Sequence, residues 1–179
     1  MDCLQTLNED FLKKLMEAFE IIKGKGFELR PFYCRRDPWE QAKLWRQSRT
    51  KDTIERTIGM LKRSNAEYLA QILEEVGPQS GRWATNAIPG ASHHQYGNAI
   101  DCFVLDPHSG KAIWNPNNPG YQVYAEAATS VGLESGYFWS KKDMVHCQLN
   151  KDRMTDLCSW REINNLISVE YPQRPIKNT

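Results

Sequence analysis

Hydrophobic residues recur at regular spacings along most of the chain. Apolar positions three or four residues apart predict amphipathic helices, over 4–23, from 38 to about 47, 50–76, 121–131 and 156–167. Alternating or continuous apolar runs predict short strands, at 27–34, 98–106, 137–139 and 144–149. Because apolar spacing in the segment 50–76 is interrupted around 63–65, that segment predicts two helices with a kink.

Turn and cap residues sharpen several of these boundaries. Gly24 and Gly26 end the first helix, and Gly132 ends the helix 121–131. Asp37 followed by Pro38 is a typical helix start, with an N-cap carboxylate and a proline at the first helical position. A proline at position 31 places its strand at a sheet edge or at a bend, because proline cannot donate a ladder hydrogen bond.

Length and composition describe an ordinary globular protein. With 179 residues and no repeat or linker, we expect a single domain over 1–179 that ends in a Pro-containing polar tail. The net charge is +1, from 23 basic and 22 acidic residues, without a polybasic block, which argues against a nucleic-acid partner. No run approaches the roughly 18 apolar residues of a membrane span. The amphipathic N-terminus is unlike a secretory signal, so we expect folding in a cytoplasm.

Five scattered cysteines form no CxxC pair. Their odd number, together with the expected cytoplasmic folding, predicts reduced thiols and not a disulfide framework. Cys102 and Cys147 each follow a candidate metal ligand directly. Because side chains alternate along a strand, both thiols should point away from the metal and pack in the core.

The stretch 89–103 gathers two adjacent histidines and an aspartate around Gly97, and His146 lies downstream. Imidazole nitrogen and carboxylate oxygen together suit Zn²⁺. Spacing alone leaves open which histidine pairs with Asp101. His93, eight positions before it, would share a face of a continuous strand; His94, seven before it, could converge from a loop because Gly97 breaks the strand.

The segment SHHQYGNAID at 92–101 resembles the SxHxxGxAxD motif of the LAS zinc peptidases, which include lysostaphin-type enzymes, D-alanyl-D-alanine peptidases and the hedgehog domain. DMVH at 143–146 resembles the D/E-x-x-H motif of the D-alanyl-D-alanine and L-alanyl-D-glutamate branch, and Arg36 with Gln41 matches its RSxxxQ spacing. The resemblance covers 27–149, leaving 150–179 as a C-terminal helix and tail. It implies an α+β fold whose small antiparallel sheet carries a zinc site between flanking helices.

Carried over residue by residue, the resemblance makes His94, Asp101 and His146 the ligands of one zinc ion, leaving a position open for water. Asp143 becomes the general base that takes the proton of that water and delivers it to the leaving amine. Arg36 becomes the catalytic cation that holds a substrate carbonyl.

Substrate contacts are less directly implied. Besides Arg36, we expect Ser92 and Tyr96 to bind substrate. The chain departs from the family pattern at CRRD (34–37), where a Gly-Tyr-Arg-Ser run is expected, so Arg35 is chemically an equal candidate for the cation. ESGYFWSKKD (134–143) also replaces the usual Gly-Gly-x-Trp approach to the last motif.

The resemblance implies a peptidoglycan peptidase acting on stem peptides. We expect an L-alanyl-D-glutamate endopeptidase that works as a monomeric phage endolysin, made in the host cytoplasm, released through a holin and acting on the wall from the periplasm. One alternative is a bacterial D-alanyl-D-alanine carboxypeptidase or dipeptidase. Another is a catalytically inactive, hedgehog-like zinc module, although such a module would not need Asp143.

Overall fold

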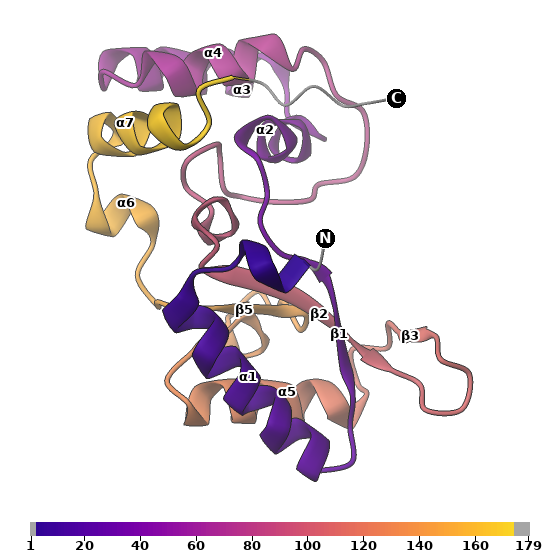
Figure 1. Ribbon diagram of the computed structural model, residues 1–179. Coiled ribbons are helices and arrows are strands. Elements are labelled where there is room, and N and C mark those ends of the chain that lie inside the picture. Colours follow the sequence, from indigo (N-terminus) through magenta and orange to yellow (C-terminus); the bar gives the residue numbers. More distant parts are fainter. Residues whose placement is uncertain (1–2, 174–179) are drawn as a thin grey trace. The chain divides into compact units, whose positions relative to one another are not determined.

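The computed structural model describes residues 3–173 and has an α+β fold (Figure 1). Its contacts divide the chain into two compact units. The first contains the residues up to 35 and 96–151, and the second contains 36–95 and the residues from 152 onward. The α+β class expected from the sequence is confirmed, while the single domain over 1–179 stays a prediction. The end of the polar tail, 174–179, lies outside the described residues.

The first unit is built on an antiparallel sheet. Its strands are β1 (Leu29–Tyr33), β2 (Ala99–Leu105), β3 (Ala112–Ile113), β4 (Glu134–Ser135) and β5 (His146–Gln148). The order is β1-β2-β5-β4, and the short β3 pairs with the far end of β2. β2 is therefore the central strand, with β1 along one side and β5 and β3 along the other.

Helices α1 (Glu9–Gly24) and α5 (Pro119–Ser130) contact each other and enclose the core of this unit (Figure 1). Asparagine side chains begin both helices: Asn8 accepts from the backbone of Asp10, and Asn118 from that of Gly120. The fully buried apolar side chains between the helices and the sheet include Phe11, Leu15 and Ile100.

Burial along β2 alternates with the period of a strand. Cys102 and Val104 are buried in the core, whereas Asp101, Phe103 and Leu105 are half-buried on the opposite face. The sheet therefore has an apolar inner face and an outer face that carries polar and aromatic side chains. Of the edge position or bend expected from the proline in β1, the edge position is confirmed, because β1 is an edge strand. Its register with β2 also shifts between Pro31 and Tyr33.

The second unit is helical. Its helices are α2 (Pro38–Arg46), α3 (Lys51–Arg63), α4 (Glu67–Glu75), α6 (Met154–Leu157) and α7 (Trp160–Glu170). Asp37 caps α2 as the sequence predicted, accepting from the backbone N–H of Glu40 at 2.8 Å. The predicted break within 50–76 is also confirmed: α3 ends before Asn65, which has a positive φ, and α4 begins two residues later. None of the helices within residues 3–173 combines the length and apolar character needed to cross a bilayer.

Three predicted elements differ from the structure. The first helix starts at Glu9, because Asn8 provides the cap and Cys3–Thr6 form a separate 3-10 turn, η1. The run 137–139 is no strand: Gly136–Phe138 form a 3-10 turn, η3, and the strand lies just before it. The helix predicted over 156–167 is two helices, because Ser159 forms a capping box with Glu162 that starts α7 anew.

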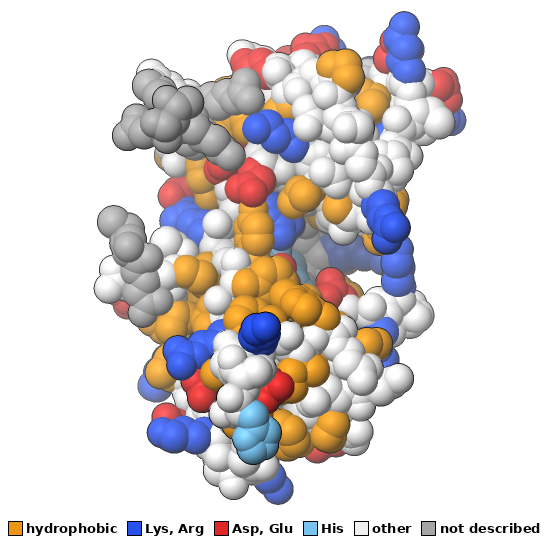
Figure 2. Space-filling model, turned by 90° about the vertical axis from the view of Figure 1, so that its right-hand side faces the viewer, with side chains coloured by type: hydrophobic (Ala, Val, Ile, Leu, Met, Phe, Trp, Pro, Cys, Tyr) orange, Lys and Arg blue, Asp and Glu red, His pale blue; other side chains and the backbone are white. Residues whose placement is uncertain are grey.

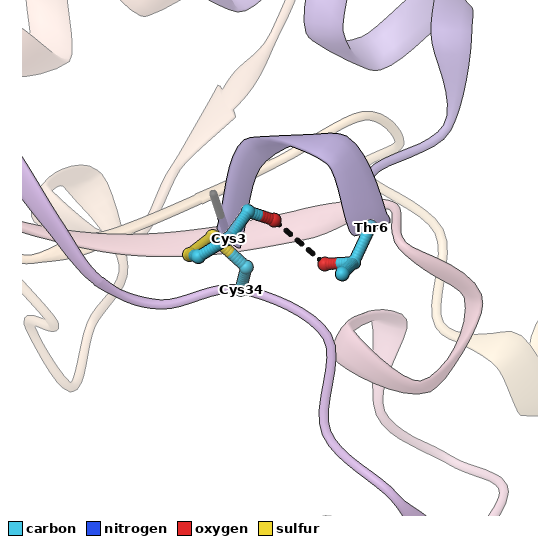
Figure 3. The surroundings of a disulfide bond; sticks show 3 residues. All are labelled: Cys3, Thr6 and Cys34. Atoms are coloured by element: carbon cyan, nitrogen blue, oxygen red, sulfur yellow. Dashed lines mark hydrogen bonds between the residues drawn. A yellow bond between two sulfur atoms is a disulfide. The ribbon is translucent and has the colours of Figure 1, made fainter. Parts of the chain in front are cut away.

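The prediction of reduced thiols was wrong for two cysteines. Cys3 and Cys34 form a disulfide (Figure 3), with Cα atoms 5.8 Å apart, a usual separation for such a bond. The turn η1 brings Cys3 beside the end of β1, and the Thr6 hydroxyl donates to the Cys3 carbonyl. Sequence spacing could not show this approach, because the two residues are separated by 31 positions.

Removing the disulfide should destabilise the protein. Because the bond closes a loop of 31 positions, Cys3→Ser or Cys34→Ser should lower the free energy of unfolding by about 3 to 4 kcal/mol. Urea denaturation of the oxidised proteins measures this, with Cys158→Ser as the control because that thiol is free. A reducing agent should lower wild-type stability to the level of the Cys3→Ser variant. Equal stability with and without the bond would contradict the prediction.

Candidate metal centre

Pairing of β2 with β5 sets two of the candidate ligands opposite each other. Asp101 is the register partner of His146, so both side chains project from the outer face of the sheet. The His146 Nδ1 and Asp101 Oδ1 atoms are 3.1 Å apart. Both side chains are largely buried, with exposed fractions of 9% and 13%. This pair is set by the backbone ladder itself.

His94 belongs to the 3-10 turn η2 (His93–Tyr96), which leads through Gly97 into β2. Gly97 has φ +69°, and a Cβ there would lie 2.8 Å from the backbone oxygen of Thr6. The Gly97 carbonyl instead accepts from the backbone N–H of Asn8 at 2.9 Å. The glycine of the motif is therefore required both for the turn and for the approach of the N-terminal segment.

The structure brings the three predicted ligands together. One ligand atom from each of His94, Asp101 and His146 lies within 4.8 Å of the other two. The neighbouring histidine has a different partner: His93 Nε2 is 2.9 Å from the backbone carbonyl oxygen of Asp152. Two imidazoles and one carboxylate form a donor set typical of a catalytic zinc site.

Gln148 holds the ring of His146 and was not predicted from the sequence. Its side-chain nitrogen donates to the backbone carbonyl of Asn150, so its Oε1 is the atom that faces His146 Nε2, at 2.9 Å. The Nε2–H must therefore donate to Gln148, and Nδ1 is the nitrogen turned toward Asp101. Such outer partners fix the tautomer of a metal-binding histidine. The sequence did carry one hint: Gln148 follows His146 by two positions, so a strand places both side chains on the same face.

The electrostatics of His146 fit a cation at this position. Burial lowers the pKa of His146, but the hydrogen bond and charge of Asp101, the charge of Asp143 and the Gln148 bond together raise it above the usual value. Nδ1 and the Asp101 carboxylate oxygen both carry lone pairs, and they need a proton or a metal ion between them. Binding of a metal would replace that proton.

The neighbouring thiols are excluded from the site, as the strand alternation predicted. Cys102 and Cys147 are fully buried in the core of the first unit. Burial raises the pKa of the Cys147 thiol to about 12 and that of Cys102 well above its usual value. These two side chains are therefore packed as protonated, small apolar groups.

Asp143 is exposed and lies one turn before His146, in a loop that closes on Gly136. The Asp143 backbone N–H donates to the Gly136 carbonyl at 2.8 Å, and the His146 N–H donates to the Asp143 carbonyl at 3.3 Å. A Cβ on Gly136 would come within 2.6 Å of the Asp143 carbonyl oxygen. Position 136 must therefore lack a side chain for Asp143 to sit here. Trp139 completes the loop, with its ring centroid 5.1 Å from that of His146.

Arg36 is buried, whereas the alternative cation, Arg35, is exposed. The guanidinium of Arg36 donates to Gln41 Oε1 at 2.9 Å, and Gln41 in turn donates to the carbonyl of Ala87 at 2.7 Å. The Arg36 backbone N–H also donates to the His94 carbonyl at 3.1 Å. This network explains the Arg36-to-Gln41 spacing, because the glutamine on α2 orients the arginine that precedes the helix.

The two other predicted substrate-binding residues flank the histidines. Ser92 is buried directly before η2, and its carbonyl accepts from the backbone N–H of Gln95 at 3.1 Å. Tyr96 is half-buried at the end of the same turn. Their contacts with substrate stay a prediction.

Comparison with known proteins identifies the family. The model of the VanY family, described as D-alanyl-D-alanine carboxypeptidase, matches residues 4–150. This chain belongs to the VanY family. The match confirms the resemblance to LAS-type zinc peptidases, and the chain is accordingly a zinc-dependent peptidase of peptidoglycan. No curated protein matches the chain significantly.

Three solved structures are similar to this chain, at comparable sequence identity and coverage. The zinc complex of an alanine mutant of VanY, a vancomycin resistance D,D-pentapeptidase from a VanB-type cassette, is 16% identical, with a TM-score of 0.46 over 88% of this chain and 83% of that one. VanYB in complex with D-alanine-D-alanine is 16% identical, with a TM-score of 0.45 over 92% and 84%. The Serratia marcescens L-Ala D-Glu endopeptidase ChiX is 18% identical, with a TM-score of 0.41 over 82% and 83%.

Zinc affinity should separate ligands from positioning residues. Replacing His94, Asp101 or His146 by Ala should abolish stoichiometric zinc binding, because each removes a donor atom. Gln148→Ala should retain zinc but weaken its affinity by about 10- to 100-fold, the usual cost of losing an outer hydrogen bond. Competition with a chelator, followed by elemental analysis, measures these affinities.

Two variants control this series. His93→Ala should keep one zinc per chain, because the Nε2 of His93 faces the backbone carbonyl oxygen of Asp152. Gln122→Ala removes an exposed glutamine of α5 whose side chain donates to Glu126 on the same helix, and it should leave affinity unchanged. The ligand assignment is wrong if His93→Ala loses zinc while His94→Ala retains it.

Proposed function

We propose that this peptidase is an L-alanyl-D-glutamate endopeptidase, which cuts the peptidoglycan stem next to the sugar. The observation that carries the proposal is the D-x-x-H turn, in which an aspartate, and not a glutamate, precedes the last ligand. Gly136 holds that aspartate against His146. The shorter carboxylate resembles the L-alanyl-D-glutamate branch more closely than the dipeptidases.

His94, Asp101 and His146 would hold the zinc ion, which would supply a Lewis acid for the scissile carbonyl and acidify the attacking water. Asp143, exposed beside His146, takes the proton from this water and delivers it to the leaving amine. Arg36 holds the carbonyl oxygen as negative charge develops on it, and Gln41 keeps its guanidinium oriented. Ser92 and Tyr96, on either side of the histidines, contact the stem peptide.

The alternative function is a D-alanyl-D-alanine carboxypeptidase. The matching family model carries that description, which favours this reading. Both reactions use the same ligands, base and cation, so the choice between them depends on which part of the stem the surrounding surface accepts.

We further propose a role as a phage endolysin, released by a holin and acting as a monomer on the wall from the periplasm. Cutting next to the sugar supports this role, because it frees whole stems with their cross-links, whereas a carboxypeptidase trims only terminal residues. The Cys3–Cys34 disulfide also supports action outside a reducing cytoplasm. Co-expression with a holin in a Gram-negative host should cause lysis, and Asp143→Asn should prevent it.

The role of Asp143 can be tested separately from zinc binding. Asp143→Asn should keep zinc and the fold while losing about 10²-fold or more in turnover, because the general base is gone. Gly136→Ala should also lower turnover, since its Cβ would crowd both Asp143 and the Cβ of His146. Gly24→Ala is the matched control, because a Cβ there meets nothing within 4 Å. Near-full turnover by Asp143→Asn would refute the mechanism.

The bond itself is identified by mass spectrometry of digested sacculi. Hydrolysis of L-alanyl-D-glutamate should release peptides with N-terminal D-glutamate and leave L-alanine on the glycan. Free D-alanine with the L-alanyl-D-glutamate bond intact would overturn the proposed specificity and establish the carboxypeptidase instead.

A further inference from the structure

Three aromatic rings meet on the outer face of the sheet, outside the hydrophobic core. Phe103 lies on β2, Phe32 on the neighbouring β1, and Trp114 directly after β3. Their ring centroids are 5.3 Å apart for Phe32 and Trp114, 5.6 Å for Phe103 and Trp114, and 6.2 Å for Phe32 and Phe103. We call these three residues the aromatic platform.

The platform is unusually exposed for its apolar character. Exposed fractions are 43% for Phe32 and 53% for Trp114. Figure 2 views the side on which β3 lies, and hydrophobic side chains gather there on the surface. Large exposed aromatic surfaces on a folded protein commonly mark a binding site. The three rings lie outside the cluster of buried core residues, so packing of the core does not account for their placement.

The platform is continuous with the metal centre. Phe103 follows Asp101 by two positions on β2, so both side chains project from the same face, with backbones roughly 7 Å apart. Arg30, the cross-strand partner of Phe103, and Glu28 form an exposed ion pair at 2.6 Å beside the rings. The face therefore offers flat apolar rings with charged donors and acceptors at their edge.

We propose that the aromatic platform binds the N-acetylmuramic acid ring that carries the stem peptide. This inference rests on the proposed L-alanyl-D-glutamate specificity. A pyranose ring offers apolar C–H faces for stacking on aromatic side chains, and its hydroxyl and acetamido groups suit a polar rim such as Arg30 and Glu28.

Distance along the substrate supports this occupant. In the proposed reaction only L-alanine and the lactyl ether separate the scissile carbonyl from the sugar ring. At about 3.5 Å per extended residue, this places the ring roughly one to two residue lengths from the metal centre, which is the offset of the platform. Cleavage at D-alanyl-D-alanine would place the sugar roughly 10 Å farther away, because three more residues intervene.

The experiment compares two substrates with the same pentapeptide stem. One carries N-acetylmuramic acid, and the other carries an N-lactyl group and no sugar. Trp114→Ala should raise KM for the sugar-bearing substrate roughly 3- to 10-fold, the scale of one lost aromatic contact. Its kcat/KM for the sugar-free substrate should stay within twofold of wild type. Trp114→Phe should largely restore the lower KM, because it retains a ring.

Several outcomes are distinguished in the same assays. Equal effects of Trp114→Ala on both substrates, or none on either, would overturn the platform. Phe32→Ala repeats the comparison if circular dichroism shows that Trp114→Ala is unfolded. If wild type sediments as a dimer and Trp114→Ala as a monomer, with no change in KM, the aromatic platform is a self-association surface. That result would also overturn the proposal. Product masses report the bond separately: cleavage at D-alanyl-D-alanine would refute the proposed function, whereas cleavage at L-alanyl-D-glutamate with equal effects on both substrates would refute only the platform.

Discussion

The antiparallel register between β2 and β5 is the constraint on which the rest of the structure depends. It sets Asp101 opposite His146 and, by the alternation of side chains, turns Cys102 and Cys147 into the core. The sheet thus separates the metal ligands on its outer face from the apolar core on its inner face. On one face, helices α1 and α5 supply apolar packing. On the other, the carboxylate and imidazole are held close by the backbone, before any metal contributes binding energy.

Local sequence features predicted most of the fold because they act over a few residues. The cap and proline at Asp37 and Pro38 start α2 where expected, and hydrophobic periodicity located the other long helices. Failures occurred where a polar contact overrode apolar spacing. Because Asn8 is its N-cap, α1 begins later than the periodicity suggested, and the capping box at Ser159 begins a separate helix, α7. The strand predicted at 137–139 is a turn, because aromatic residues there form the loop around Asp143 and do not enter a ladder.

The three residues that meet at the candidate metal centre were predictable from motifs, and the contacts that support them were not. A motif preserves spacing within one segment, so it located His94 and Asp101, and the second motif located His146. Gln148 lies beyond both motifs, and its role follows only from the hydrogen bond of its amide to Asn150, which orients the oxygen toward the histidine. The disulfide between Cys3 and Cys34 likewise joins segments far apart in sequence, which no spacing rule could have paired.

The strict alternation of side chains along β2 limits which sequence changes this site can tolerate in evolution. Substitutions can alter the half-buried outer residues, such as Phe103 or Leu105, without disturbing the inner face. An insertion or deletion of one residue between Gly97 and Asp101 would instead rotate every later side chain of the strand to the other face. Cys102 would then point outward beside His146, and the carboxylate would be forced into the apolar core. Insertions and deletions are therefore compatible with the exposed hairpin turn at 107–111 but not with β2, the strand that precedes it.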